Sequence, residues 1–264
     1  MNHDGHIARK RFGQNFLHDR SVVARIIASI VPRADQRLVE IGPGQGALTY
    51  PLLEAIGALT AIEIDRDLIA RLQRQAAKHG QLELIEADVL KVDFTALAAG
   101  RRLRIVGNLP YNISTPILFH VLDHAGVIED MHFMLQKEVV ERMAASHGNK
   151  AYGRLTVMLQ ARCRVEALFI VPPTAFAPAP KVESAIVRIT PLAAAAIPAA
   201  DMGRLDRIVR AAFSQRRKTL RNAVEGVLSV DQLKGAGIDP GLRAEQLAVA
   251  DFLRLAAITG GPLA

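Results

Sequence analysis

The chain has 264 residues, which is enough for one large domain or for a medium domain with a small second one. Half of the residues are apolar and 22% are charged, so the composition excludes a disordered chain. Lys and Arg total 33 against 26 Asp and Glu, and the net charge of +7 suits a polyanionic partner without requiring one. The single cysteine, Cys163, excludes an intramolecular disulfide and a cysteine-based zinc site.

The N-terminal sequence MNHDGHIARKRFGQNF has no apolar stretch after its charges, and no run of about 18 apolar residues occurs anywhere. We therefore expect a soluble, cytoplasmic protein with no membrane segment. None of the eight histidines shows metal-ligand spacing, so we expect no metal.

Short apolar runs alternate with helical patterns between residues 38 and 136. The runs are residues 38–41, 59–64, 82–85, 103–106 and 131–135. Strands that alternate with helices predict a parallel sheet with both faces covered. Helical patterns follow over 137–145 and 155–160, and two further apolar runs, 165–171 and 184–189, flank a proline-rich loop. We expect these two runs to be the last strands of the same sheet.

A stretch of small residues bounded by prolines, PLAAAAIPAA at 191–200, reads as a linker. Beyond it the sequence indicates three or four short helices, for example 205–213 and 247–258. We predict an α/β domain over residues 1–192 and a small all-helical domain over 193–264.

Three glycines, Gly42, Gly44 and Gly46, directly follow the first predicted strand and precede a helical pattern. Glycines in this context let the backbone approach a ligand at a helix N-terminus. The same residues with Ala47 satisfy the loose dinucleotide pattern, and Glu63 lies near the spacing expected for a ribose-binding acid. The segment alone leaves three readings open: a methyl-donor site, a dinucleotide site and a purely structural turn.

Two acids, Glu63 and Asp88, end the second and third predicted strands. Open α/β sheets bind ligands at the carboxyl ends of their strands. We expect Glu63 to accept hydrogen bonds from ribose hydroxyls and Asp88 to accept one from an adenine amino group.

The tetrapeptide Asn108-Leu109-Pro110-Tyr111 follows the fourth strand. An amide oxygen and a backbone carbonyl that accept both N–H bonds of the adenine amino group would localise its delocalised lone pair. Pro110 stiffens the turn, and Tyr111 offers a face on which an extruded base can stack. The tetrapeptide favours a transferase over a dehydrogenase, although an ordinary turn remains the alternative.

Four segments together, KRFGQNFL, VEIGPGQGALT, NLPYNIS and FAPAPKVESAIV, resemble those of the S-adenosylmethionine-dependent rRNA adenine N6-dimethyltransferases. The resemblance runs from Arg9 to Leu255. It implies a Rossmann-like class I methyltransferase sheet with a small C-terminal helical domain. FSQRRKTLRN and RAEQLAVADFLRLA look like the small-subunit enzymes rather than the large-subunit, antibiotic-resistance enzymes.

The resemblance also implies an activity and roles for residues. The activity is dimethylation of two adjacent adenosines near the 3′ end of 16S rRNA, in the small subunit or its precursor, by a monomeric enzyme that takes part in small-subunit biogenesis. Asn15 and Leu17 would close over the cofactor, and Gly42, with Gly44 in the same turn, would approach its methionine portion. Glu63 would hold the ribose and Asp88 the adenine. The catalytic residues would be Asn108, Leu109, Pro110, Tyr111 and Phe176, with Tyr111 and Phe176 sandwiching the flipped base.

Seven cations fall within residues 204–221, against the single acid Asp206. If this segment were one helix, several of the cations would share a face. A solvated helix face is the alternative to RNA binding. The residues that we expect to contact rRNA are Arg9, Lys10, Arg11, Arg207, Arg210, Arg217, Lys218 and Arg221.

Two functions from other classes remain open. A non-catalytic rRNA-binding assembly factor could keep the same fold, and an oxidoreductase could use the glycine turn. The sequence offers no hydride-transfer site for the second.

Overall fold

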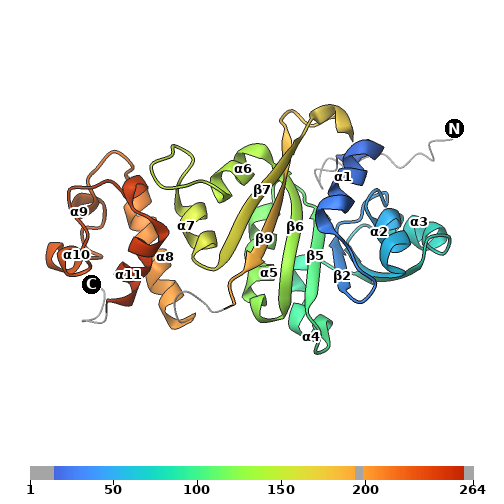
Figure 1. Cartoon of the computed structure of the whole chain (residues 1–264), viewed down its shortest axis with the longest axis horizontal. Helices are drawn as coiled ribbons and strands as arrows, with labels where there is room; N and C mark the ends of the chain where they lie inside the picture. The colour runs from blue at the N-terminus through green and yellow to red at the C-terminus, as the bar shows by residue number, and fades with distance from the viewer. Residues whose placement is uncertain (1–14, 194–198, 259–264) are drawn as a thin grey trace. The chain divides into compact units, whose positions relative to one another are not determined.

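The computed structural model describes residues 15–193 and 199–258, and its contacts divide the chain into two compact units. Unit 1 comprises the described residues up to Val140 together with Glu166–Pro191, and unit 2 comprises Glu141–Val165 and the described residues from Leu192 onward. Figure 1 shows both units along the chain.

The predicted domain boundary near residue 193 follows the last strand of unit 1, but residues 141–165, which we placed in the first domain, cluster with unit 2. The physical reason lies in α7 (Arg154–Gln160), which packs on α8 (Ala199–Ser214). Arg154 at the start of α7 also pairs with Asp206 of α8 at 2.8 Å. The sequence pattern showed the helix but not its packing partner.

Unit 1 is built on a seven-stranded sheet in the order β4-β3-β2-β5-β6-β9-β7. The strands are β2 (Arg37–Ile41), β3 (Ala58–Glu63), β4 (Gln81–Glu86), β5 (Leu103–Asn108), β6 (Ile128–Gln136), β7 (Cys163–Val171) and β9 (Ser184–Pro191). All seven predicted strands are present. The first five pair in parallel, whereas β9 runs antiparallel to β6, so the sheet is mixed.

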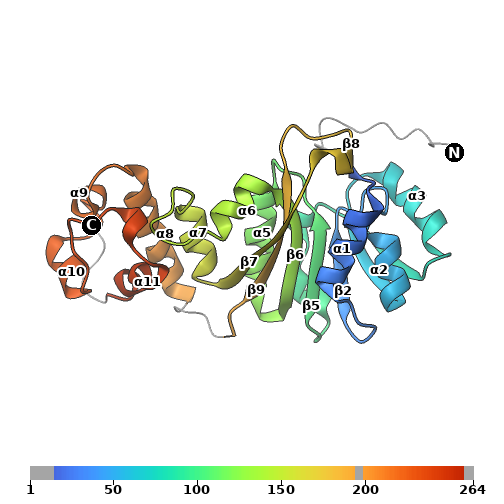
Figure 2. The same cartoon turned by 45° about the horizontal axis from the view of Figure 1, so that its top comes forward.

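Helices cover the sheet, with α1 on the near face and α5 behind it (Figures 1 and 2). They are α1 (Arg20–Ile30), α2 (Thr49–Ile56), α3 (Arg66–Ala76), α4 (Phe94–Ala98), α5 (Ser114–Asp123) and α6 (Lys137–Met143). Most residues of the central strands are apolar and buried, and Val39, Ile105 and Val106 are fully buried. This agrees with the continuous apolar runs of a covered parallel sheet.

A second, two-stranded sheet joins the start of the described chain to the proline-rich loop. In it, β1 (Phe16–Leu17) pairs antiparallel with β8 (Phe176–Ala177), with Leu17 opposite Phe176. The amide of His18 also donates to the carbonyl of Ala175 at 2.9 Å. Strands of two residues are too short to leave a periodic signal, and the sequence did not predict this pair.

The last carbonyls of α1 are capped by arginines from the sheet. Arg104 of β5 donates from Nη2 to the carbonyl of Ile30 at 2.7 Å and binds both carboxylate oxygens of Asp130 at 2.8 Å. Side chains of Arg104 and Asp130 are 7% and 15% exposed, so this is a buried pair. Helix ends leave such carbonyls without partners, and cations there also favour the helix dipole.

A second arginine completes this arrangement. Arg188 of β9 donates from Nη2 to the carbonyl of Ser29 at 2.7 Å and from Nε to Nε2 of His132 at 3.0 Å. Because an arginine only donates, Nε2 of His132 is the unprotonated nitrogen and the ring is neutral. We call Arg104, Asp130, His132 and Arg188 the arginine clamp.

Unit 2 is helical. Besides α7 and α8 it contains α9 (Leu220–Ala223), α10 (Val230–Gly235) and α11 (Val249–Ala257). We predicted three or four short helices after residue 193; the described part has four, of which α9, α10 and α11 are short, whereas α8 extends over 16 residues. Leu205, Ile208 and Phe252 are fully buried in its core. Residues 194–198 of the predicted linker lie outside the described residues.

No helix within residues 15–193 and 199–258 is long and apolar enough to cross a membrane.

Candidate active site and cofactor cavity

A cavity of about 380 Å³ lies at the carboxyl ends of β2, β3 and β5, the edge where open α/β sheets bind ligands. Every predicted cofactor residue lines it: Asn15, Leu17, Gly42, Gly44, Glu63, Asp88 and Asn108. Leu109, Pro110 and Tyr111 of the tetrapeptide line it as well. The structure thus brings together residues that are up to 96 positions apart, from Asn15 to Tyr111.

The glycine turn between β2 and α2 needs its glycines. Gly42 and Gly44 have φ angles of +66° and +58°, in the left-handed region. A Cβ on Gly44 would also come within 3.3 Å of the Phe16 ring, so the segment before α1 packs directly over the turn. The turn and the N-terminal segment form one wall of the cavity.

Glu63, the last residue of β3, is held by three backbone amides. Its Oε1 accepts from Ile64 and Asp65 at 2.8 and 2.9 Å, and its Oε2 accepts from Gly44 at 3.4 Å. Burial raises the pKa of Glu63, and these amides oppose the rise because they favour the charged form. The long bond at Oε2 leaves that oxygen able to accept from a ligand hydroxyl.

Glu40, the last residue but one of β2, is a cavity residue that the sequence analysis did not identify. It is 2% exposed, and Oγ1 of Thr49 donates to its Oε2 at 2.7 Å. Burial raises the pKa of Glu40 to about 7, the Thr49 hydroxyl opposes this, and repulsion from Glu63 adds to it. The signal was available: an acid inside a buried apolar strand such as LVEI requires a reason.

Asp88 follows β4 and caps the short 3₁₀ turn Val89–Lys91, with Oδ1 accepting from the amide of Leu90 at 3.0 Å. Two exposed apolar side chains accompany the acids, Ile64 at 51% and Leu90 at 37%. Both line the cavity. Acidic acceptors beside apolar walls suit a flat heterocycle that carries an amino group.

The charge of the lining is one-sided. Among the described residues that line the cavity there are three acids, Glu40, Glu63 and Asp88, and no Lys or Arg. An environment of this kind favours a cation and opposes the phosphates of a dinucleotide. It fits S-adenosylmethionine, whose sulfonium is positively charged, and it argues against the oxidoreductase reading of the glycine turn.

Asn108, at the end of β5, is oriented by the N-terminal segment. Its Nδ2 donates to the backbone carbonyl of Asn15 at 3.2 Å. In this orientation Oδ1 is the atom left to accept from a substrate amino group. The residue is half-buried and lines the cavity together with the glycine turn and Tyr111.

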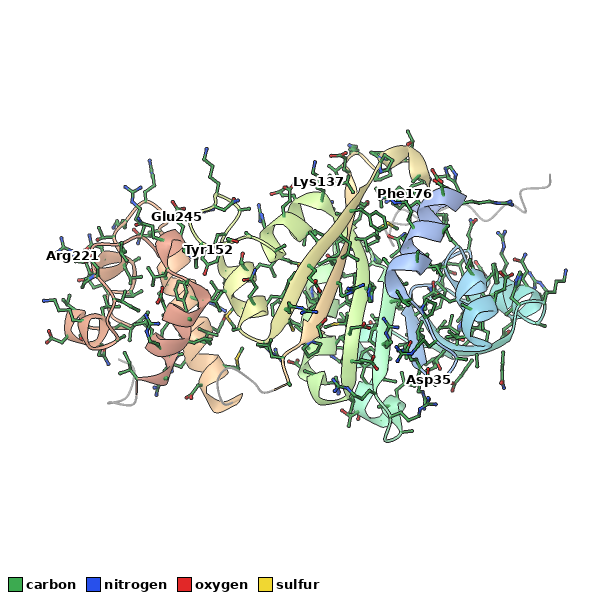
Figure 3. All side chains as sticks on the ribbon, viewed as in Figure 1. Asp35, Lys137, Tyr152, Phe176, Arg221 and Glu245 are labelled. Atoms are coloured by element: carbon green, nitrogen blue, oxygen red, sulfur yellow. The ribbon has the colours of Figure 1, made fainter. Side chains whose placement is uncertain are left out.

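Phe176 stands apart from the other predicted catalytic residues. It does not line the cavity, and its ring is 3% exposed in a core cluster with Leu17, Val22 and Ile26. Figure 3 shows it on the loop beside α1. The conformation described here therefore does not present Phe176 to a base in the cavity.

The basic segment of unit 2 is not one helix. α8 ends at Ser214, residues 215–218 form an exposed turn, and Arg221 lies on the separate helix α9. The chain turns because the next apolar residue, Leu220, is fully buried and its amide donates to the carbonyl of Leu242. The shared helix face that we considered for these cations does not exist.

Contacts sort these cations into two groups. Arg204 donates to the carbonyl of Ile258 at 2.6 Å, and Arg216 donates to the carbonyl of Tyr152 at 3.2 Å and to Glu245 at 3.0 Å. Arg210 pairs with Asp206 at 3.3 Å. Of the seven cations in residues 204–221, the other four are exposed and form no side-chain hydrogen bond or ion pair within the described residues: Arg207, Arg217, Lys218 and Arg221. Figure 3 shows Arg221 at the outer edge of the unit and Tyr152 beside Glu245.

The remaining predicted RNA contacts, Arg9, Lys10 and Arg11, lie outside the described residues. A third basic cluster, at residues 101–104, is engaged inside unit 1: Arg101 binds the carbonyl of Asp35, Arg102 that of Ile128, and Arg104 belongs to the clamp. In the described part of the chain, no group of three or more His, Cys, Asp or Glu could hold a metal ion.

Comparison with known proteins identifies the family of this chain. The family model for ribosomal RNA adenine dimethylase matches residues 5–259. The chain is 62% identical over 249 residues to ribosomal RNA small subunit methyltransferase A of Xanthomonas campestris pv. campestris, covering 94% of this chain and 95% of that one. The Xanthomonas oryzae pv. oryzae protein of the same name is 61% identical, again covering 94% of this chain and 95% of that one.

Two solved structures are similar over nearly the whole chain. A dimethyladenosine transferase from Plasmodium falciparum has a TM-score of 0.79 at 27% identity and covers 91% of this chain and 95% of its own. The 23S rRNA methyltransferase ErmE has a TM-score of 0.73 at 28% identity, and the match covers 92% of this chain and 98% of that one. The chain belongs to the ribosomal RNA adenine dimethylase family, the S-adenosylmethionine-dependent rRNA adenine dimethyltransferases.

Proposed function

We propose that this rRNA methyltransferase dimethylates the N6 amino groups of two adjacent adenosines near the 3′ end of 16S rRNA, in the small ribosomal subunit or its precursor. The observation that carries the choice of subunit is the 62% identity to a protein named for the small ribosomal subunit. ErmE, named for 23S rRNA, favours the second candidate, but it is only 28% identical. The proposal includes a monomeric, cytoplasmic enzyme with a role in small-subunit biogenesis.

The cavity supports the following placement of the cofactor. When bound, S-adenosylmethionine supplies an activated methyl group on a sulfonium, so the protein needs alignment more than a strong base. Gly42 and Gly44 would admit its methionine portion, Glu63 would bind the ribose hydroxyls and Asp88 the adenine. Asn15 and Leu17 would cover it, since they line the cavity from the segment that packs over the glycine turn.

Asn108 and its neighbours would act on the target base. The Oδ1 of Asn108 would accept one N–H bond of the adenine amino group and the carbonyl of Leu109 or Pro110 the other, which localises the nitrogen lone pair toward the methyl group. Asn108 is neutral and is not a general base. After transfer, the positively charged amine is acidic enough to release its proton to water.

Tyr111 would stack on one face of the flipped adenine. Phe176 would cover the other face only after its ring leaves the core, which requires the β1–β8 pair to shift. Because β1 follows Asn15 directly, such a shift would involve the cofactor cover as well. Intact catalytic and cofactor residues make a purely structural assembly factor the weaker alternative.

The four unpartnered cations Arg207, Arg217, Lys218 and Arg221 support phosphate contact by unit 2, and the proposal extends to Arg210, Arg9, Lys10 and Arg11. Replacing one phosphate-contacting cation lowers affinity at every RNA sequence and reduces the salt slope by about 1. We expect Arg221→Gln to weaken binding to small-subunit particles in this way. Lys234→Gln on α10 is the matched control, because Lys234 is also exposed but lies outside residues 204–221.

The proposed substrate is tested by transfer of labelled methyl groups to small subunits from a strain that lacks this modification, with mapping of the methylated nucleotides by mass spectrometry. We expect two dimethyladenosines in 16S rRNA. Transfer to 23S rRNA alone would overturn the proposal in favour of the large-subunit alternative. Calorimetry that detects no S-adenosylmethionine binding would favour the assembly factor.

A further inference from the structure

A hydroxyl that no proposed role uses lies behind the base-stacking residue. Ser184 is the first residue of β9 and is fully buried. Its Oγ lies 2.6 Å from the phenol oxygen of Tyr111, which is a short, well-formed hydrogen bond. Burial raises the pKa of Tyr111, so its phenol keeps its proton at neutral pH and can donate it to Ser184.

The backbone around Ser184 is held firmly. Ser184 pairs with Gln136 of β6 in the ladder of the main sheet. The preceding residue, Glu183, accepts from the amide of Lys137 at 3.0 Å, and its carboxylate pairs with Nζ of Lys137 at 2.8 Å. Because its backbone is fixed, the Ser184 hydroxyl can hold a hydrogen-bonded partner in one position.

The ring of Tyr111 requires a side-chain contact of this kind, because the main chain alone does not fix its orientation. The turn is restrained by Pro110 and by Oγ of Ser114, which donates to the carbonyl of Tyr111 at 3.2 Å. These contacts leave two side-chain torsions free. A hydrogen bond at the far end of the ring restricts both, and it therefore sets the plane on which a base would stack.

Ser184 also shares its chain segment with the other predicted wall. Phe176 and Ser184 are eight residues apart, and two prolines, Pro178 and Pro180, stiffen the connection between them. Figure 3 shows Phe176 and Lys137 at the same end of the sheet. One segment would thus carry the second aromatic wall and orient the first.

We propose that Ser184 is a positioning residue for methyl transfer: its hydroxyl fixes the ring of Tyr111 in the plane that receives the target adenine. The proposal rests on the proposed stacking role of Tyr111. It assigns to Ser184 no contact with the cofactor or the base. Its loss should therefore slow turnover on RNA while leaving cofactor binding intact.

The test compares Ser184→Ala, Tyr111→Phe and the double variant in the methyl-transfer assay on undermethylated small subunits. Each single change breaks the same hydrogen bond, so we expect each to lower kcat about 3- to 10-fold, the range of one hydrogen bond. The double variant should be no slower than either single variant, because nothing is left to lose. Ser184→Thr, which keeps the hydroxyl, should recover at least part of the rate.

Two controls separate positioning from damage to the fold. The Kd for S-adenosylmethionine, by calorimetry, should stay within about twofold for all variants, which also shows that they are folded. Thr60→Val removes another buried strand hydroxyl, which is bonded to Glu83 at 2.9 Å and does not line the cavity, and should leave kcat unchanged.

Full activity of Ser184→Ala would overturn the proposal, and so would single-variant losses that multiply in the double variant. Failure of the proposed stacking gives a different result. In that case Tyr111→Ala would retain activity. If Tyr111→Ala is inactive and Ser184→Ala is fully active, only the proposed role of Ser184 is overturned.

Discussion

Unit 1 buries charged side chains at the amino ends of its parallel strands and also at their carboxyl ends. At the first end the charges are paired with each other, and at the second they are not. In the arginine clamp, Arg104 and Asp130 neutralise each other with two bonds of 2.8 Å, and the arginines also cap α1. In the cavity, Glu40 and Glu63 are both buried, and within residues 15–193 and 199–258 their hydrogen-bond partners are a hydroxyl and backbone amides. Figure 3 shows the two ends, marked by Asp35 and Phe176.

The difference shows that the partners of a buried charge indicate whether it stabilises the fold or binds a ligand. A charge whose partners all belong to the protein is part of the fold, and removing one partner exposes the cost of burying the other. Burial raises the pKa of both Glu40 and Glu63, and repulsion from Glu63 adds to the rise at Glu40. Burying an acid in this way lowers stability when it is charged, so a cationic ligand is the natural complement. The clamp serves the fold, and the cavity serves the cofactor.

The largest expected effect comes from breaking the clamp. Arg104→Met leaves Asp130 buried without its cation, which should cost about 3 to 5 kcal/mol of unfolding free energy. Urea unfolding followed by circular dichroism measures it. Adding Asp130→Leu to Arg104→Met should restore much of the loss. An unchanged midpoint for Arg104→Met would show that the pair is not structural.

The next effect lies in the cavity and concerns rate alone. Asn108→Ala removes the proposed acceptor of the target amino group, and loss of one such polar contact in a transition state costs about 10²- to 10³-fold in kcat. Methyl transfer to small subunits should fall by that factor while the urea midpoint stays near that of the parent. Retained turnover would mean that the tetrapeptide does not carry the chemistry.

The pH dependence of stability should have opposite signs at the two ends. The pKa of Glu40 is raised from 4.5 to about 7 in the folded state, so its contribution is fully present below pH 4.5 and is lost as pH rises through 7. The pKa of His132 is lowered from 6.5 to about 4, chiefly by burial, so its contribution is present above pH 6.5 and is lost as pH falls through 4. Each shift corresponds to about 3 kcal/mol.

Two variants separate these contributions in urea titrations between pH 4 and 8. Glu40→Gln should stabilise the protein at pH 8 relative to the parent and have little effect at pH 4.5. His132→Gln should flatten the loss of stability below pH 6.5. If both variants show the parent's pH profile, the burial of these two groups is not what sets it.

The smallest effect concerns cofactor affinity. Glu63→Gln removes one negative charge and one pair of ribose acceptor sites, and we expect the Kd for S-adenosylmethionine to rise about 10-fold, equivalent to about 1.4 kcal/mol. Calorimetry measures it, with Glu83→Gln on β4 as the control, because Glu83 is exposed and outside the cavity. Equal losses in both variants would point to a general charge effect.

The sequence predicted the strands, the helices and the location of the cavity better than the side-chain contacts between distant segments. Long apolar runs such as residues 131–135 produce a strong signal, and the glycine turn and strand-end acids mark the cavity because parallel strands bring their ends together. Glu40 was overlooked because it lies inside a strand. The β1–β8 pair, the clamp and the bond from Tyr111 to Ser184 each join residues far apart in the chain, which no local pattern encodes.

The helix predicted over residues 205–213 lies within α8, but the case of one helix across all the cations of residues 204–221 does not hold. α8 ends at Ser214, and the next apolar residue, Leu220, is buried on the separate helix α9. Arg204 and Arg216 then serve the packing of unit 2, which charge counting could not distinguish from free cations.

Cys163 gives this protein a practical property. It is the only cysteine in the chain, its side chain is buried, and burial raises the pKa of its thiol to about 12. Thiolate is the species that reacts with maleimides and related reagents, so the natural protein should be nearly inert toward them. A single cysteine introduced at an exposed position, for example in place of Lys234, would accept one fluorophore at a known site without any prior removal of native thiols.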